Sequence, residues 1–309
     1  MEFTDGALHL PSFLTVTLGI VVLFVGRRIN DAVAFLREFS IPEPVTGGLI
    51  FSVLFGLVYA ATGVAVEFDL AARDMLLVYF FTTIGINASF KDLLAGGKPL
   101  LILLALTIGY MFIQNLTGIS VATLFGQPAA VGILGGTVSL IGGHGTAIAW
   151  APQIAEGFGV ANAMEIGIAC ATFGLILASL MGGPIAKFLI NRHKLVPAVV
   201  EPQDIGSSSD PQQKVGMSYL DVLDAVLAIH ICIVLGLLLN TWVADLGLQL
   251  PTFVTCLFAG ILVTNLIPSN FPRISGTRWP TRTPAIALIA EISLGTFLAM
   301  SLMLSLIHI

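Results

Sequence analysis

Charged residues are scarce in this chain. Only 10% of its 309 residues are Asp, Glu, Lys or Arg, against roughly 25% in an ordinary soluble protein. Hydrophobic residues make up 56% of the sequence, and the mean hydropathy is +0.98. A soluble domain of this length needs more polar residues to cover its surface, which excludes soluble enzymes and disordered chains. The formal net charge of −5 leaves no excess of basic residues for nucleic-acid phosphates.

Several functional motifs are also absent. The three cysteines, Cys170, Cys232 and Cys256, all lie in apolar runs, which argues against a disulfide framework. No GxxxxGK[ST], G-x-S-x-G or HExxH segment occurs in the sequence. An ATP-driven pump and an enzyme are therefore not expected. The N-terminal segment is acidic and lacks the positive start of a cleavable signal peptide.

Long apolar runs dominate what is present. Most are near the ~20 residues that an α-helix needs to cross a bilayer core, and they predict an all-α polytopic membrane protein. The runs are Pro11–Gly26, Val45–Gly63, Met75–Ser89, Pro99–Phe125, Ala129–Trp150, Asn162–Ile190, Tyr219–Val243, Pro251–Pro268 and Ala285–Ile309.

The positions of Lys and Arg predict the orientation of these spans. Arg27, Arg28 and Arg37 follow the first run, so that loop is expected in the cytoplasm and the N-terminus outside. If the run 129–150 enters the membrane and returns to the same side, every Lys and Arg except Arg73 becomes cytoplasmic. We therefore expect 129–150 to be a re-entrant loop.

Weak internal similarity suggests two related halves. Ile41-Pro42 opens one apolar run and Leu250-Pro251 opens a later one. Similar halves of opposite orientation are typical of inverted-repeat secondary transporters. We expect a first membrane repeat over 1–190, a cytoplasmic linker over 191–218 and a second repeat over 219–309. Two generic Pro-initiated apolar helices are the alternative.

The second repeat is expected to be incomplete. Fewer residues follow Tyr219 than a unit matching the first would need, and no second Gly-rich run occurs there. The last apolar run also stops without a polar or charged flank. The sequence therefore predicts a C-terminal truncation.

Glycines crowd the segment Ile133–Trp150, ILGGTVSLIGGHGTAIAW. A continuous lipid-facing helix tolerates this density poorly, and irregular backbone at membrane depth is allowed only where protein or water surrounds it. Free N–H groups at a half-helix start can bind a carboxylate. The candidate substrate-binding residues are Ser139, Gly142, Gly143, His144, Gly145 and Thr146. A Gly-rich helix-packing face is the alternative.

Polar residues inside other spans are candidate Na⁺ ligands, since hard cations prefer oxygen. These are Thr82, Asn87, Glu165 and Thr172. We expect Gly85 to break the helix between Thr82 and Asn87. The alternatives are threonines bonded to their own helix and an interfacial Glu165 near a helix N-terminus.

Gln114 and Asn115 lie in the middle of the fourth run. Amide side chains at membrane depth commonly form hydrogen bonds between helices. We expect both residues to do so.

The chain resembles the bacterial sodium/glutamate symporter family over nearly its whole length. The segments that carry the resemblance are IPEPVTGGL, FFTTIGINAS, LAGGK, GGHGTAIAW, CATFGLIL, GGPIAKFL, LPTFVTCLFAGIL and SLGTFLAMSLM. The residues after Met303 cease to match.

This resemblance implies two inverted domains, each with a Gly-rich re-entrant loop, and Na⁺-driven import of L-glutamate across the inner membrane by alternating access. It maps the family's first loop onto Ser139–Trp150. It implies Na⁺ as the coupling ion, no other cofactor, surrounding lipid and a homodimer. The alternatives are a Na⁺-coupled carrier of another carboxylate and a channel-like ion-binding protein.

Overall fold

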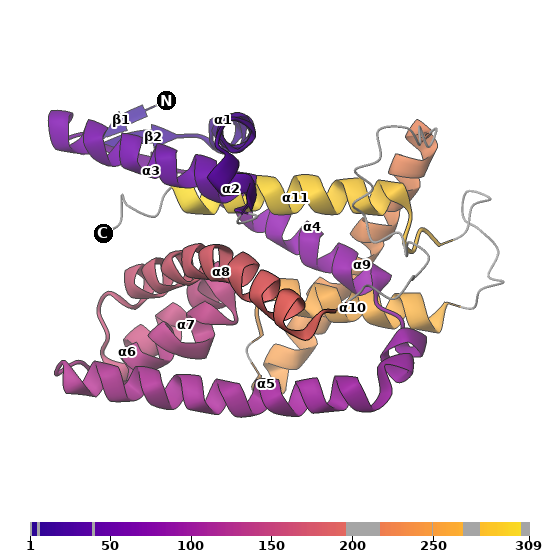
Figure 1. Cartoon of the computed structure of the whole chain (residues 1–309). Coiled ribbons are helices and arrows are strands. Elements are labelled where there is room, and N and C mark those ends of the chain that lie inside the picture. Colours follow the sequence, from indigo (N-terminus) through magenta and orange to yellow (C-terminus); the bar gives the residue numbers. More distant parts are fainter. Residues whose placement is uncertain are drawn as a thin grey trace. The chain divides into compact units, whose positions relative to one another are not determined.

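The computed structural model describes residues 2–4, 7–38, 41–195, 217–248, 250–267 and 279–303. Nearly all of this part is helical (Figure 1). The helices are α1 (Ser12–Ala32), α2 (Ala34–Glu38), α3 (Glu43–Thr62), α4 (Ala71–Asn87), α5 (Phe90–Leu124), α6 (Ala129–Ile133), the π-helical turn η1 (Leu134–Val138), α7 (Gly143–Phe158), α8 (Ala163–His193), α9 (Tyr219–Asp245), α10 (Thr252–Leu266) and α11 (Pro284–Met303). The strands are β1 (Glu2–Thr4), β2 (Ala7–Leu10) and β3 (Ala65–Phe68).

Six helices within the described residues are long and apolar enough to cross a membrane. They are α1, α3, α5 from Leu93, α8, α9 and α11. Two shorter apolar stretches cover Ala129–Val138 and Thr252–Leu266. The prediction of an all-α polytopic membrane protein is confirmed. The expected linker 191–218 lies mostly outside the described residues.

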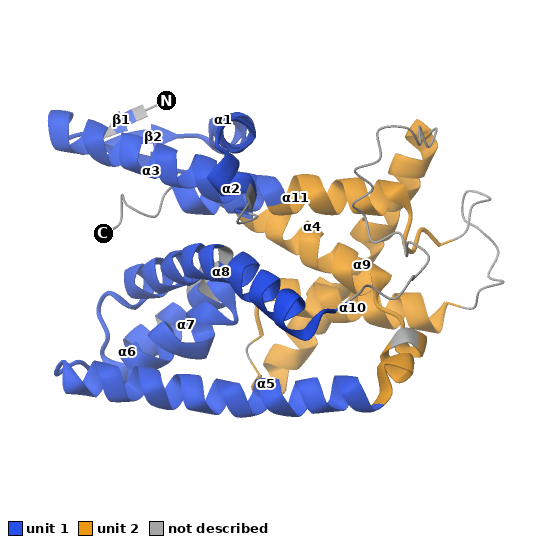
Figure 2. Ribbon diagram, viewed as in Figure 1, with its two compact units in different colours: residues 1–73, 98–196, 295–309 blue, residues 74–97, 197–294 orange. Residues whose placement is uncertain are grey.

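The chain forms two compact units, coloured separately in Figure 2. Unit 1 contains residues 1–73, 98–196 and 295–309, and unit 2 contains residues 74–97 and 197–294. These units do not follow the expected division at the linker, because α4 belongs to unit 2 and the end of α11 belongs to unit 1. The two sequence repeats remain a prediction.

In unit 1, α1 and α3 pack closely against each other where Gly26 meets Gly47. A Cβ added to Gly26 would lie 2.9 Å from the backbone N of Gly47. One turn after Gly26, Asn30 Nδ2 donates to the carbonyl O of Ile41 at 2.7 Å, and Asn30 Oδ1 accepts from Thr46 Oγ1 at 2.7 Å. These bonds fix the turn that leads through Pro42 into α3.

A small sheet joins the segments before α1 and after α3. β2 pairs antiparallel with β1 and parallel with β3, and His9 Nδ1 lies 3.1 Å from Glu67 Oε2. The apolar and charge patterns of the sequence do not predict these strands. Because β2 pairs with β3, the two segments lie at the same end of the α1–α3 pair, as the expected topology requires. Which side of the membrane that end faces remains a prediction.

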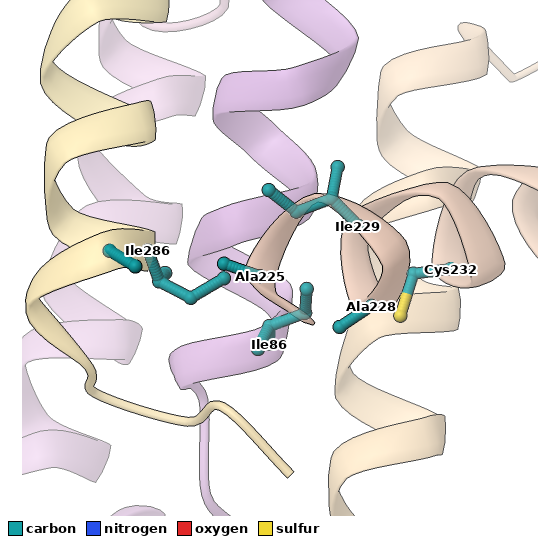
Figure 3. Close-up of a cluster of buried hydrophobic side chains, with 7 residues drawn as sticks. Ile86, Ala225, Ala228, Ile229, Cys232 and Ile286 are labelled. Atoms are coloured by element: carbon teal, nitrogen blue, oxygen red, sulfur yellow. The ribbon is translucent and has the colours of Figure 1, made fainter. Parts of the chain in front are cut away.

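In unit 2, α9 and α10 pack in the same manner as α1 and α3. A Cβ added to Gly236 would lie 2.8 Å from the backbone N of Cys256. Asn240 Nδ2 donates to the carbonyl O of Leu250 at 2.8 Å, and Pro251 then begins α10. A buried apolar cluster joins α9 to α4 and α11 within this unit (Figure 3). Its members are Ile86, Ala225, Ala228, Ile229, Cys232, Ala285 and Ile286.

Helix α4 contacts α10 through Gly85. A Cβ at Gly85 would lie 2.3 Å from the carbonyl O of Leu257, so only glycine allows this approach. The helix continues through this position to Asn87. The expectation that Gly85 breaks the helix is therefore wrong, because its glycine serves close packing instead.

Candidate functional site

The Gly-rich segment forms a helical hairpin with an interrupted backbone. Its first arm is α6 with η1, and its second arm is α7. Ala130 and Leu134 of the first arm share one buried cluster with Ala151 and Ile154 of α7, which shows that the arms fold back on each other. Such a hairpin is the shape expected of a re-entrant loop, but its entry into the bilayer remains a prediction.

The backbone leaves helical geometry at two glycines. Gly136 has φ −102° and ψ −131° inside η1. Gly143 has φ +70° at the start of α7, a conformation that residues with a side chain rarely adopt. Between them, Ile141 N and Gly142 N both donate to the carbonyl O of Thr137, at 3.2 and 2.9 Å. These bonds close a tight turn between the arms.

The second arm begins without a side-chain cap. Gly142 is the N-cap of α7 and no side chain accepts a hydrogen bond there. The first N–H groups of a helix have no partner within the helix, and the helix dipole makes this end positive. The backbone of Gly143, His144 and Gly145 therefore offers donors to an anion at the point where the hairpin is broken.

Helix α8 supports the hairpin through two glycines about two turns apart. A Cβ at Gly167 would lie 3.2 Å from Ala147 Cβ, and a Cβ at Gly174 would lie 2.4 Å from Leu140 Cδ2. Ser139 is 2% exposed and its hydroxyl donates to the carbonyl O of Gly167 at 3.0 Å. The turn of the hairpin is thus held against a rigid helix.

Helix α5 supports the hairpin from another element of unit 1. A Cβ at Gly118 would lie 2.2 Å from the carbonyl O of Gly132, so the two backbones touch. One turn earlier, Asn115 Oδ1 accepts from both the backbone N and the Oγ1 of Thr137, each at 2.9 Å. The expected interhelical bond of Asn115 is confirmed. Gln114 Oε1 is buried with no donor, so the same expectation is wrong for that oxygen.

The predicted substrate-binding residues fall together around this turn. Thr146 Oγ1 donates to the carbonyl O of Gly142 at 3.0 Å, and Ser139 is engaged with α8. Both hydroxyl protons therefore stabilise the hairpin in this structure. The side chain of His144 lies outside the described residues. The binding role of this set, Ser139, Gly142, Gly143, His144, Gly145 and Thr146, remains a prediction.

The predicted sodium ligands fall in both units. In unit 2, Thr82 Oγ1 donates to Val78 O at 2.6 Å, which is the alternative of a threonine bonded to its own helix. Asn87 Oδ1 accepts from the backbone N of Arg282 at 2.8 Å. In unit 1, Glu165 is exposed in the first turn of α8 and Thr172 is buried. The sodium site remains a prediction.

Comparison with known proteins now places the chain. A family model described as sodium/glutamate symporter matches residues 8–309. The chain belongs to the sodium/glutamate symporter family. A curated sodium/glutamate symporter of Escherichia coli (strain K12) is 35% identical over 297 residues, which cover 96% of this chain and 72% of that relative. One of Haemophilus influenzae is 36% identical over 295 residues, covering 94% and 72%. No solved structure matches the chain.

Membership of the sodium/glutamate symporter family confirms the resemblance drawn from the motifs. The family is one of multi-pass membrane transporters, not enzymes. The family match runs to Ile309, so it includes the residues after Met303 that the motif resemblance left out.

The sequence predicts for Asn115 only a hydrogen bond between helices. Its contact with the broken segment was not foreseen. The signal was present, because a strongly polar side chain in a span is costly and marks a functional candidate. Its partner could not be identified from sequence, since Thr137 lies on a different element.

In unit 2, polar side chains clamp the turn from α4 to α5. Asn265 Nδ2 donates to Ala88 O at 2.9 Å, and its Oδ1 accepts from Phe90 N at 2.8 Å. Thr264 Oγ1 donates to Ile86 O at 3.0 Å. These contacts satisfy backbone groups at two helix ends. Within the described residues no group of three or more His, Cys, Asp or Glu side chains could hold a metal ion.

Proposed function

We propose that this protein is a Na⁺-coupled secondary symporter that imports L-glutamate across the bacterial inner membrane by alternating access. The observation that carries the proposal is the family match over residues 8–309. The hairpin also supports the proposal. It lies within the matched residues, its backbone is interrupted, and the N–H donors at the start of α7 have no side-chain cap.

The glutamate carboxylate is proposed to bind at the start of α7. The N–H groups of Gly143, His144 and Gly145 lie in the first turn of this helix, at its positive end. Space at the turn favours this reading, since a Cβ at Gly143 would meet no atom within 4 Å. Ligand atoms can therefore approach the backbone at that position.

Na⁺ is proposed as the coupling ion, with Thr82, Asn87, Glu165 and Thr172 as its candidate ligands. Glutamate carries a net negative charge and must enter against an inside-negative potential. Each elementary charge moved across 100 mV is worth ~2.3 kcal/mol. More than one accompanying Na⁺ makes uptake electrogenic and favourable.

Uptake of [³H]glutamate into proteoliposomes tests this function. An inward Na⁺ gradient is expected to drive accumulation, and an equal K⁺ gradient is the control. Exchange of labelled for unlabelled glutamate without a gradient separates a carrier from a channel, since a channel does not exchange. Accumulation of another carboxylate in place of glutamate would favour the alternative substrate, and Na⁺-independent flux would contradict the proposal.

The glycines at the two ends of α7 provide a matched pair for the binding site. Gly143 and Gly159 have φ of +70° and +69°, and a Cβ at either meets no atom within 4 Å. Replacement by Leu causes similar backbone strain at both, about 1–2 kcal/mol. We expect Gly143→Leu to abolish glutamate binding and Gly159→Leu to retain it. Equal transport by the two variants would contradict binding at Gly143.

The N-terminus is proposed to lie outside, with 129–150 re-entrant and with two chains forming a homodimer in lipid. Labelling of a cysteine introduced at Phe3, which is 63% exposed, tests the first point. A membrane-impermeant maleimide is expected to label it in intact cells. Labelling only after lysis would reverse the orientation. Crosslinking in native membranes tests the dimer.

A further inference from the structure

One polar side chain on α5 holds the broken arm of the hairpin. Oδ1 of Asn115 accepts from the backbone N and from Oγ1 of Thr137, each at 2.9 Å. Three large apolar side chains on α5 near Asn115 are exposed. Phe112, Ile113 and Leu116 are 74%, 62% and 67% exposed, as lipid-facing residues of a span would be. The asparagine is therefore directed at the hairpin, away from this exposed face.

The bond meets the backbone directly after an interruption of the helix. The Gly136 dihedrals of φ −102° and ψ −131° interrupt η1 directly before Thr137. An N–H group without a partner in a membrane interior is strongly unfavourable. Asn115 Oδ1 accepts from Thr137 N at this interruption. A Cβ at Gly136 would lie 2.5 Å from Asn115 Oδ1, so glycine at this position is what lets the amide reach the backbone.

The same threonine closes the turn to the second arm. Ile141 N and Gly142 N donate to the carbonyl O of Thr137, and α7 begins at the next residue, Gly143. Thr137 therefore donates its N–H to Asn115, and its C=O accepts the two bonds that close the turn. Displacing Thr137 must displace the start of α7.

Direct ligation by this oxygen is disfavoured. An amide oxygen has two lone pairs, and Asn115 Oδ1 already accepts from two donors of Thr137. It has no remaining lone pair for a substrate ammonium group or for Na⁺. A role in positioning explains the contacts better than a role in binding.

We propose that Asn115 is a positioning residue of the glutamate site. By fixing Thr137 from α5, it sets the orientation of the uncapped first turn of α7. The crossing of Gly118 with Gly132 of α6, one turn along α5, holds α5 against the same arm of the hairpin. This inference rests on the proposed function, because it assumes that glutamate binds at that turn.

The test compares Asn115→Leu with Gln114→Leu, its neighbour on α5. Gln114 is the matched control, because its buried Oε1 has no donor to lose. We expect Asn115→Leu to raise the KM for glutamate by about tenfold or more, as the loss of two part-buried hydrogen bonds predicts. Gln114→Leu is expected to keep the wild-type KM. Asn115→Asp retains acceptor oxygens and is expected to restore part of the loss.

A second readout does not depend on transport. Ile141 is 45% exposed within the turn. In a chain whose own cysteines are replaced by alanine, Ile141→Cys reports the conformation of the turn through its rate of reaction with a soluble maleimide. We expect Asn115→Leu to change this rate at least about fivefold and Asn115→Asp to return it toward the starting value, since the hydrogen bonds are what hold the turn.

The outcomes separate the inference from the proposed function. Wild-type KM and labelling rate in Asn115→Leu would overturn the inference, and so would equal defects in Gln114→Leu. If Asn115→Leu does not fold, Thr137→Val removes only the hydroxyl donor and is expected to shift both readouts in the same direction by less. If the wild type takes up no glutamate, the proposed function fails, while the labelling rates still test the role of Asn115.

Discussion

The contact between α5 and α6 gives the sharpest prediction of stability. A Cβ at Gly118 would lie 2.2 Å from the carbonyl O of Gly132, whereas a Cβ at Gly109 on the same helix would meet no atom within 4 Å. Replacing either glycine by Ala favours the helix by up to ~1 kcal/mol. Only Gly118→Ala also forces two backbones apart, and such overpacking typically costs about 1–3 kcal/mol.

The propensity gain cancels when the two variants are compared with each other. Gly109→Ala is therefore expected to be as stable as the wild type or more stable. Gly118→Ala is expected to be less stable than Gly109→Ala by about 1–3 kcal/mol. The assay heats the detergent-purified protein and measures the fraction that remains monodisperse on size exclusion. Because Gly132 belongs to the hairpin, Gly118→Ala is also expected to lose glutamate uptake. Equal melting of both variants would refute the contact between these backbones.

Three further substitutions test individual polar side chains. Asn240→Leu removes the donor to Leu250 O. Because that carbonyl is left unpaired, stability is expected to fall by about 1–3 kcal/mol in the same melting assay. Unchanged melting would contradict the role of this bond. Gln114→Leu removes a buried oxygen without a donor, so stability should be equal or higher, and a fall would show that the oxygen has a partner. Tyr79→Phe removes the hydroxyl that lies 2.6 Å from Nε2 of His230. Faster modification of that imidazole by diethyl pyrocarbonate is expected, measured by mass spectrometry, and an unchanged rate would argue against the bond.

The membrane spans were predictable because they depend on local composition. Runs of apolar residues and prolines at helix starts require no tertiary information, and α3 and α10 begin directly after Pro42 and Pro251 as the sequence suggested. The two-armed hairpin was also predictable in outline. Dense glycine in an apolar run favours broken helix, whichever helices surround it.

What glycine does at a given position was not predictable. Gly85 suggested a break in α4, yet the helix is continuous there and the glycine admits the carbonyl of Leu257. Gly136 does interrupt a helix, and an amide from α5 satisfies the exposed backbone. The difference lies in partners that are distant in sequence, Leu257 in one case and Asn115 in the other. No local pattern distinguishes the two.

The α1–α3 and α9–α10 pairs share a set of contacts that favours two related halves. Asn30 and Asn240 each donate to the carbonyl that precedes a proline, at 2.7 and 2.8 Å. Those prolines are the N-caps of α3 and α10, with φ and ψ of −62° and 139° in one and −59° and 140° in the other.

The glycine one turn before each asparagine meets the partner helix in the same way. A Cβ at Gly26 would lie 2.9 Å from Gly47 N, and a Cβ at Gly236 would lie 2.8 Å from Cys256 N. A proline at a helix start is common and two could coincide by chance. The joint recurrence of a glycine contact, an asparagine bond and a proline cap is far less expected of unrelated helices. The α1–α3 and α9–α10 pairs therefore favour the predicted repeat, and within unit 2 the α9–α10 pair packs against α4, a helix that precedes the linker. Because α4 precedes the linker in sequence but packs in unit 2, the compact units do not follow the linker.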